Sequence, residues 1–439
     1  MLKNQHDILY TVIVFCYVML INFTCSNFRS FRDEQTLSML PGKTLNHQSH
    51  IVKVGKTEVL NTAAIFGANA SGKSNIYKAM RFSRELILGF KINTRSYFRL
   101  DPKYETTPST FEYELTIGEK LFRYGFRVII STGEIVGEWL FRVSEDENEE
   151  DKVIFQRPLE NNPHPEVLTK FKRRLSRYLI LTLSDELRKH HSEEIADILE
   201  VRDWFSNNLK IISTEENLLS ELSYSDDQVK ELGELLGDFD LGVFSVGFEY
   251  ADIKSYDVGA PIFMRKGINI HDHCVINKDG IGTDKERRVA DAKEQSCILL
   301  NNHGSDKEQF MWFDESDGTR RIMDLAPIII SDVPDVTYIV DELDRSLHPM
   351  VVYEFVRRFA NRNSEVAKQL IFTTHQTCLL DQNLLRRDEI WFVQKDRSGT
   401  SDLYSLDDFG ERFDKNIEKF YLGGRYEGIP NINRREFIV

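Results

Sequence analysis

Cysteine is scarce in this sequence, and its few copies are not paired. The 439 residues contain five scattered cysteines with no CxxC spacing among them: Cys16, Cys25, Cys274, Cys297 and Cys378. An odd and scattered set disfavours a disulfide framework and a zinc ribbon, because both need paired or closely spaced thiols. Cysteine usage of this kind fits the reducing cytoplasm.

An excess of positive charge is also missing. Lys and Arg number 56 against 70 Asp and Glu, so the formal net charge is −14. This balance argues against a protein coated with nucleic acid, although it leaves room for a local basic groove. No internal repeat and no low-complexity segment stand out. A chain of this length has room for two or three domains, each with its own core.

A nearly apolar run, ILYTVIVFCYVMLINF, covers residues 8–23. It is short for a membrane span, which needs roughly 20 residues, and no small-residue cleavage site follows it. A membrane anchor and an unused tail are the two interpretations. We favour the tail: the first strand begins at Met19, residues 1–18 are an extension outside the fold or a short hydrophobic tail, and no membrane is involved.

Alternating polar and apolar residues predict antiparallel strands in the first third of the chain. The segments TFEYELTI and LFRYGFRVII, separated by GEK, form one predicted hairpin, and STGEIVGEWLFRV continues into a second. The acidic run at 145–151 is typical of an exposed loop. Apolar residues at helical spacing then predict several helices, the last over 225–239 with Ser225 or Asp226 as its cap. Strands resume at VFSVGFEY.

Two short apolar runs late in the chain, VTYIVDE (336–342) and QLIFTTH (369–375), are rich in β-branched residues. Each is typical of a buried strand in a parallel sheet, and the segment between them is typical of a helix. This βαβ unit, followed by the strand EIWFVQKD, predicts an α/β fold. The expected fold class is a parallel sheet with an antiparallel β subdomain and a helical insertion.

The segment at 67–74 matches the phosphate-binding pattern GxxxxGK[ST] at every fixed position. It follows the apolar run AAIF and precedes a predicted helix, as the pattern requires. Backbone amides of the loop and the helix N-terminus would bind phosphate oxygens, Lys73 would reach the β- and γ-phosphates, and Ser74 would hold Mg²⁺. The predicted nucleotide-binding residues are Gly67, Ala68, Asn69, Ala70, Ser71, Gly72, Lys73, Ser74 and Asn75.

Polar side chains end both late strands. Asp341 and Glu342 suit a magnesium ligand and a base for the attacking water, and His375 is placed to contact the γ-phosphate. A solvated acidic turn and a structural histidine are the alternatives. Before a predicted helix, Ser316, Gly318 and Thr319 offer a second anion-binding site. Since one nucleotide rarely needs two such sites, we expect this one to serve the nucleotide of a second subunit.

The order of P-loop, serine–glycine segment, VDE, SLHP and TTH resembles the ABC-type ATPase heads of the SMC, RecF and OLD group. NFRSFRDEQTLSM, GANASGKSN, DELDRSLHP and the terminal YLGGRYEGIPNI resemble more closely the bacterial AAA-named ATPases of the abortive-infection type. The resemblance implies that ESDGT is the signature loop, Asp341 the Walker B aspartate and Glu342 the catalytic glutamate. It further implies that His375 is the switch histidine, that 344–349 is the D-loop and that Arg29 contacts the nucleotide. Asp317 departs from the transporter signature, and no Q-loop glutamine is evident.

This resemblance implies an ATP- and Mg²⁺-dependent ATPase that forms a homodimer or higher homo-oligomer around ATP. In this interpretation it is a sensor or regulator in anti-phage defence and controls a separate effector, a nuclease or toxin. The alternative is a DNA-repair or chromosome ATPase, for which the basic segment 170–177 is a candidate nucleic-acid surface. A transporter subunit is disfavoured, and the tail after His375 is too short for a fused nuclease domain.

One further pattern, HDHC at 271–274, is either a metal cluster or a polar loop, and we prefer the loop. The expected organisation is an extension or hydrophobic tail at 1–18, an N-terminal ATPase lobe at 19–158, a helical insertion at 159–240, a C-terminal ATPase lobe at 241–394 and a C-terminal extension at 395–439.

Overall fold

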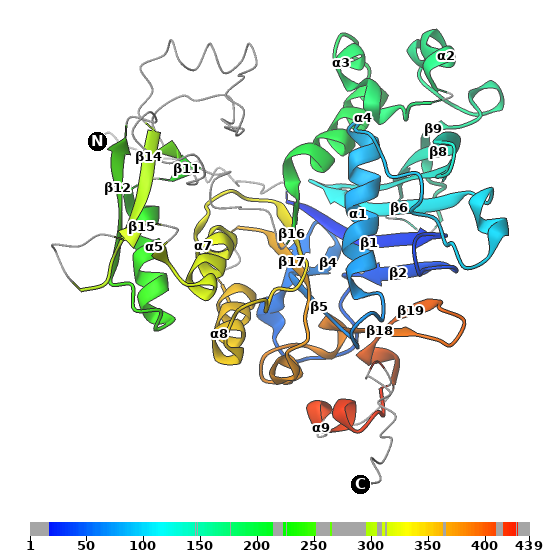
Figure 1. Cartoon of the computed structure of the whole chain (residues 1–439). Coiled ribbons are helices and arrows are strands. Elements are labelled where there is room, and N and C mark those ends of the chain that lie inside the picture. Colours follow the sequence, from blue (N-terminus) through cyan, green and yellow to red (C-terminus); the bar gives the residue numbers. More distant parts are fainter. Residues whose placement is uncertain are drawn as a thin grey trace, which may run out of the picture.

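Two six-stranded sheets organise the computed structural model of this chain (Figure 1). The structure describes residues 17–144, 146, 148–175, 177–213, 223–224, 226–251, 264–265, 296–304, 310–311, 314–362, 366–409, 416–426 and 428. The run at 1–16 and the HDHC segment at 271–274 lie outside the described residues. Within these ranges, no helix has both the length and the apolar character needed to cross a bilayer.

The first sheet is antiparallel and confirms both predicted hairpins. Its spatial order is β2 (Gln35–Ser38), β1 (Val18–Ser26), β6 (Ser109–Ile117), β7 (Lys120–Ile129), β8 (Glu134–Val143) and β9 (Lys152–Gln156). Strand β1 begins at Val18, one residue before the predicted start, and the Val18 amide donates to Asp335 Oδ1 over 3.1 Å. This bond ties the beginning of the strand to the second sheet.

The second sheet is central and carries the predicted βαβ unit. Its spatial order is β10 (Leu209–Ile212), β16 (Val336–Val340), β17 (Lys368–Thr373), β5 (Thr62–Phe66), β18 (Ile390–Lys395) and β19 (Ser401–Ser405). The first five strands are parallel, and β19 is antiparallel to β18. The parallel sheet and the antiparallel sheet together confirm the expected fold class. Strand β10, which lies inside the predicted helical insertion, was not predicted.

Both faces of the central sheet are covered, which explains why its strands are continuous apolar runs. On β5, Ala63 and Ile65 belong to a core shared with the antiparallel sheet and α1 (Lys73–Ile87). Ala64 and Phe66 point to the other face, into a core that includes three helices. These are α5 (Asp226–Asp238), α7 (Asp317–Ile330) and α8 (Pro349–Ala360).

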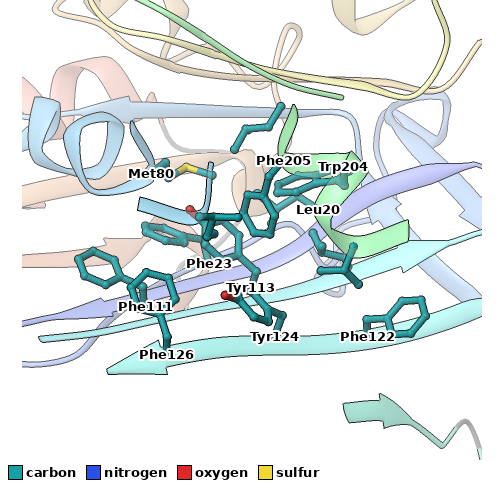
Figure 2. Close-up of a cluster of buried hydrophobic side chains, with 14 of the residues drawn as sticks. Leu20, Phe23, Met80, Phe111, Tyr113, Phe122, Tyr124, Phe126, Trp204 and Phe205 are labelled. Carbon is teal, nitrogen blue, oxygen red and sulfur yellow. The ribbon is translucent and has the colours of Figure 1, made fainter. Parts of the chain in front are cut away.

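The helical segment packs directly on the antiparallel sheet. It contains the single-turn helices α2 (Lys172–Leu175) and α3 (Ser184–Leu187), then α4 (Glu193–Asp203) and a π-helical turn at Trp204–Asn208. Figure 2 shows Trp204 and Phe205 from this turn among the aromatic side chains of the sheet. The Phe205 ring lies 4.8 Å from that of Tyr113 and 5.8 Å from that of Tyr124. The helical segment and the sheet therefore share one core.

The remaining described elements are small. A three-stranded antiparallel sheet contains β12 (Ser245–Ala251), which was predicted, together with β14 (Ser296–Asn302) and β15 (Phe310–Met311). Two short pairs join β3 (Ile51–Val54) to β4 (Thr57–Leu60) and β11 (Ser223–Tyr224) to β13 (Met264–Arg265). The last helix, α9 (Ile417–Leu422), follows β19.

Candidate nucleotide-binding site

The predicted phosphate loop connects the end of β5 to the start of α1. Gly72 precedes the helix with φ at +114°, a conformation that favours glycine. A Cβ at Gly72 would lie 2.6 Å from Ser401 Oγ and 2.7 Å from Ser30 Oγ, so no side chain fits there. The loop is thus a tight backbone turn at a helix N-terminus, which is the geometry that binds phosphate.

The ammonium group of Lys73 lies against the backbone of this loop. Its Nζ donates to Gly67 O over 2.8 Å and to Ala68 O over 3.1 Å, and lies 3.5 Å from His375 Nδ1. Burial lowers the pKa of Lys73 to about 8, against the opposing pull of nearby carboxylates. A phosphate that contacted this ammonium would supply the charge that stabilises its protonated form.

The predicted acidic pair is organised by Thr373 on the neighbouring strand. Thr373 Oγ1 donates to Asp341 Oδ1 over 2.7 Å and accepts the Glu342 amide over 2.8 Å. Glu342 has φ at +48°, in the left-handed region that non-glycine residues rarely adopt. One hydroxyl therefore fixes both the Asp341 carboxylate and the unusual backbone of Glu342. Sequence reasoning did not single out Thr373.

Arg321 on α7 was also missed, and it supports the same turn from the other side. Its Nη2 donates to Glu342 O over 3.1 Å and to Asp341 O over 3.4 Å. The side chain is buried, and burial lowers the pKa of the Arg321 guanidinium. Helix α7 begins with the predicted signature residues, so Arg321 connects the signature helix of this chain to its own acidic pair.

His375 lies at the end of β17, where it joins the phosphate loop to the acidic turn. Its amide faces the Asp344 carboxylate at 3.4 and 3.5 Å, and its ring faces Lys73. Burial, reinforced by the positive charge of Lys73, lowers the pKa of His375. The lowered pKa favours the neutral imidazole, which has one N–H to donate.

The predicted signature residues lie at the start of α7. Ser316 caps α7, because its Oγ accepts the Thr319 amide over 3.1 Å, and the two hydroxyls are 2.9 Å apart. Ser316 is exposed, and a Cβ at Gly318 would meet Ser346 O at 2.9 Å. Figure 1 shows α7 and α1 on different sides of β16 and β17. The structure thus brings Lys73, the acidic pair and His375 together, whereas the Ser316 and Thr319 hydroxyls bond to each other at the start of α7.

Arg29 lies beside the start of α1. It has φ at +52°, its amide donates to Ser96 O over 2.8 Å, and its side chain is exposed. The next residue, Ser30, accepts a 2.6 Å hydrogen bond from Asn75 Nδ2. Burial of part of the side chain and the charge of Arg99 lower the pKa of Arg29. The contact through Ser30 places the Arg29 backbone next to the predicted nucleotide loop.

The residues present suit ATP and Mg²⁺. Ser71 Oγ is buried and, within the described part of the chain, has no hydrogen-bond partner, so it remains available to a phosphate. Ser74 stands in the first turn of α1 and Asp341 directly follows β16, and both offer the oxygen ligands that Mg²⁺ prefers.

Comparison with known proteins places this site in a family. A family model described as "AAA domain, putative AbiEii toxin, Type IV TA system" matches residues 63–381. The chain belongs to this AAA-domain family. The match confirms the resemblance to the AAA-named abortive-infection ATPases and covers the loop at 67–74, the acidic pair and His375. No curated protein matches the AAA-domain chain.

Solved structures similar to this AAA-domain protein include three SMC head domains. The SMC head from Thermotoga maritima is 12% identical, with a TM-score of 0.36 over 88% of this chain and 98% of that one. An SMC head bound to the C-terminal domain of ScpA, from Pyrococcus furiosus, is 13% identical, with a TM-score of 0.43 over 93% and 99%. An SMC head bound to the C-winged helix domain of ScpA is 14% identical, with a TM-score of 0.41 over 88% and 97%.

Proposed function

We propose that this protein is an ABC-type ATPase that pairs with a second copy around Mg²⁺–ATP and regulates a separate effector in bacterial anti-phage defence. The observation that carries the ATPase assignment is the convergence of Lys73, the Thr373-linked acidic pair and a neutral His375 at one edge of the central sheet. Parallel α/β sheets bind their ligands at the carboxyl ends of their strands, and this edge is of that kind.

The binding step uses the loop at 67–74. Its amides and Lys73 hold the β- and γ-phosphates, and the N-terminus of α1 favours their negative charge. Ser74 and Asp341 would hold Mg²⁺, which would supply positive charge next to the phosphate oxygens. Arg29 lies at the edge of this site and contacts the nucleotide in our proposal.

The hydrolytic step uses the turn after β16. Glu342 accepts the proton of the attacking water, and its backbone is fixed on both sides by Thr373 and Arg321. His375 donates a hydrogen bond to the γ-phosphate from its one imidazole N–H. Burial and the charge of Lys73 lower the pKa of His375, which favours the neutral ring.

The second copy completes the site. Ser316, Gly318 and Thr319 stand at the N-terminus of α7, where Ser316 is exposed and Thr319 is buried. We assign them to the γ-phosphate of the ATP bound by the partner copy, so that ATP joins two chains and hydrolysis separates them. The helical segments then move with their lobes.

The defence role rests on the family, whose description names a putative toxin and a toxin–antitoxin system. The partner in this proposal is a nuclease or toxin in the cytoplasm. The DNA-repair alternative needs a basic surface at 170–177. In the structure Lys172 pairs with Glu160 at 3.2 Å, and Arg174 pairs with Glu186. These pairings within the chain favour a structural role for the segment.

A pair of variants tests the proposal. Glu342→Gln keeps the shape of the side chain but removes the base, so it should bind ATP and remain dimeric on it. Ser316→Arg should bind ATP as a monomer and hydrolyse none. Size-exclusion chromatography with light scattering, with and without ATP, reports both states. Normal turnover by Glu342→Gln, or full turnover by Ser316→Arg, would contradict the shared site.

A further inference from the structure

Three segments far apart in the sequence meet behind the phosphate loop. Ser30 follows β1, Asn75 lies in the first turn of α1, and Ser401 opens β19. Asn75 Nδ2 donates to Ser30 Oγ over 2.6 Å, the Ser30 and Ser401 hydroxyl oxygens are 2.7 Å apart, and Ser401 Oγ donates to Ser71 O over 2.5 Å. The Ser401 amide also donates to Ser30 O over 2.8 Å.

These bonds converge on the Ser401 hydroxyl. Ser401 Oγ donates toward both Ser71 O and Ser30 Oγ, and Ser30 Oγ also accepts from Asn75 Nδ2. Because a hydroxyl has one proton, Ser401 shares it between the Ser71 carbonyl and the Ser30 oxygen. Ser30 and Asn75 thus hold the Ser401 hydroxyl beside Ser71 O.

The bond from Ser401 to Ser71 O sets the orientation of one peptide group in the phosphate loop. A trans peptide places its C=O and the following N–H in opposite directions. Because Ser401 holds Ser71 O on the buried side of the loop, the Gly72 N–H points to the other side. The buried side is filled, since Ser401 is 0% exposed and Ser30 is 8% exposed. Phosphate can therefore reach the loop only from the side toward which Gly72 N–H points.

We propose that Ser401, held by Ser30 and acting through the Ser71 carbonyl, is a positioning residue that presets the phosphate loop for di- and triphosphate nucleotides. The inference rests on the proposed function and adds a determinant of nucleotide affinity to it. Ser30 and Ser401 both lie outside the family match at 63–381. Through these two residues, the segment after β1 and the β18–β19 hairpin of the central sheet both contact the phosphate loop.

The test is Ser401→Ala in the full chain, with Ser398→Ala as the matched control. Ser398 lies in the turn of the same hairpin, and its hydroxyl bonds only within that turn, to Asp396 and Thr400. Loss of one neutral hydrogen bond predicts a dissociation constant for fluorescent (MANT) ATP and ADP about 5-fold higher. The KM for ATP should rise by the same factor, with kcat at saturating ATP within about 2-fold of wild type.

A second variant separates positioning from general stability. Ser30→Ala removes the oxygen that holds the Ser401 hydroxyl beside Ser71 O, so it should raise both dissociation constants by about 2-fold. This variant provides the test if Ser401→Ala does not fold. Because Ser30 acts on the loop through Ser401, the double variant should bind no more weakly than Ser401→Ala. Unchanged nucleotide affinity in Ser401→Ala, additive losses in the double variant, or lost kcat with unchanged KM overturns the inference. Failure of the wild type to bind MANT-ATP would instead overturn the proposed function.

Discussion

Replacing Thr373 with valine tests how the acidic pair is organised. Valine keeps the shape of threonine but lacks the hydroxyl, which donates to Asp341 at 2.7 Å and accepts from Glu342 at 2.8 Å. Thr373 is 2% exposed, so water cannot take the place of the lost hydroxyl. The substitution therefore leaves the Glu342 amide without a partner and frees the Asp341 carboxylate to rotate.

The size of the effect follows from these two bonds. A hydrogen bond to a carboxylate contributes about 1.5–3 kcal/mol, and a buried amide left unpaired costs about 1–3 kcal/mol. Part of this loss is recovered, because the half-buried Asp341 carboxylate regains water. In addition, the left-handed backbone of Glu342 carries about 1–2 kcal/mol of strain. Without the bond to Thr373 this backbone can relax, and the relaxation moves the Glu342 carboxylate. We expect kcat to fall about 10- to 100-fold.

The assay is steady-state ATP hydrolysis at saturating Mg²⁺, with MANT-ATP binding measured separately without Mg²⁺. Binding without the metal should be unchanged, because neither bond touches the phosphate loop. Thr337→Val is the matched control: Thr337 lies on β16, the strand that leads into the acidic pair, and its hydroxyl donates to Gln369 Oε1 over 2.9 Å. If Thr373→Val retains wild-type kcat, or Thr337→Val loses as much, the reasoning is wrong.

Three further predictions concern charges near the site. Arg321→Met should lower kcat about 10-fold, because Glu342 O loses a buried charged donor. The control Arg320→Met removes a side chain whose partner is the exposed Asp317, so turnover should be unchanged. Equal losses of kcat in a hydrolysis assay would contradict this. Burial raises the pKa of Asp324 from 3.8 to about 7, so the folded state holds a proton that the unfolded state releases, and stability should fall by up to about 4 kcal/mol as the pH rises from 4 to 7. Urea unfolding across this range should show a shallower decline for Asp324→Asn, and an unchanged slope would refute the assignment. Because the pKa of Lys73 is about 8 and only its ammonium pairs with phosphate, MANT-ATP affinity should weaken as the pH rises above 8; constant affinity to pH 9 would show that Lys73 stays charged.

Local patterns were sufficient where the chemistry is local. The loop at 67–74 carries its own turn residues, and the alternation of polar and apolar residues across 110–143 is typical of a sheet with one buried face. The loop and both hairpins could therefore be predicted directly. The strands at 336–340 and 368–373 were recognisable because a parallel sheet buried on both faces needs continuous apolar runs.

The missed features depend on pairings that the sequence does not display. Strand β10 has only four residues and follows directly on a helix, so no period could develop. Thr373 and Arg321 acquire their roles because β17 and α7 both pack against the turn after β16. Ser401 is separated from Ser71 by 330 positions, and no spacing rule connects residues at that distance.

The aromatic contact shown in Figure 2 limits how the protein can be shortened. A minimal ATPase made by deleting 159–208 would remove Trp204 and Phe205 from above Tyr113 and Tyr124, all four of which are at most 1% exposed. Each uncovered ring costs roughly 1.5–3 kcal/mol, and a domain has only about 5–15 kcal/mol of net stability in total. The helical segment therefore cannot be replaced as an independent unit, because Trp204 and Phe205 cover aromatic side chains of the antiparallel sheet and shield them from water.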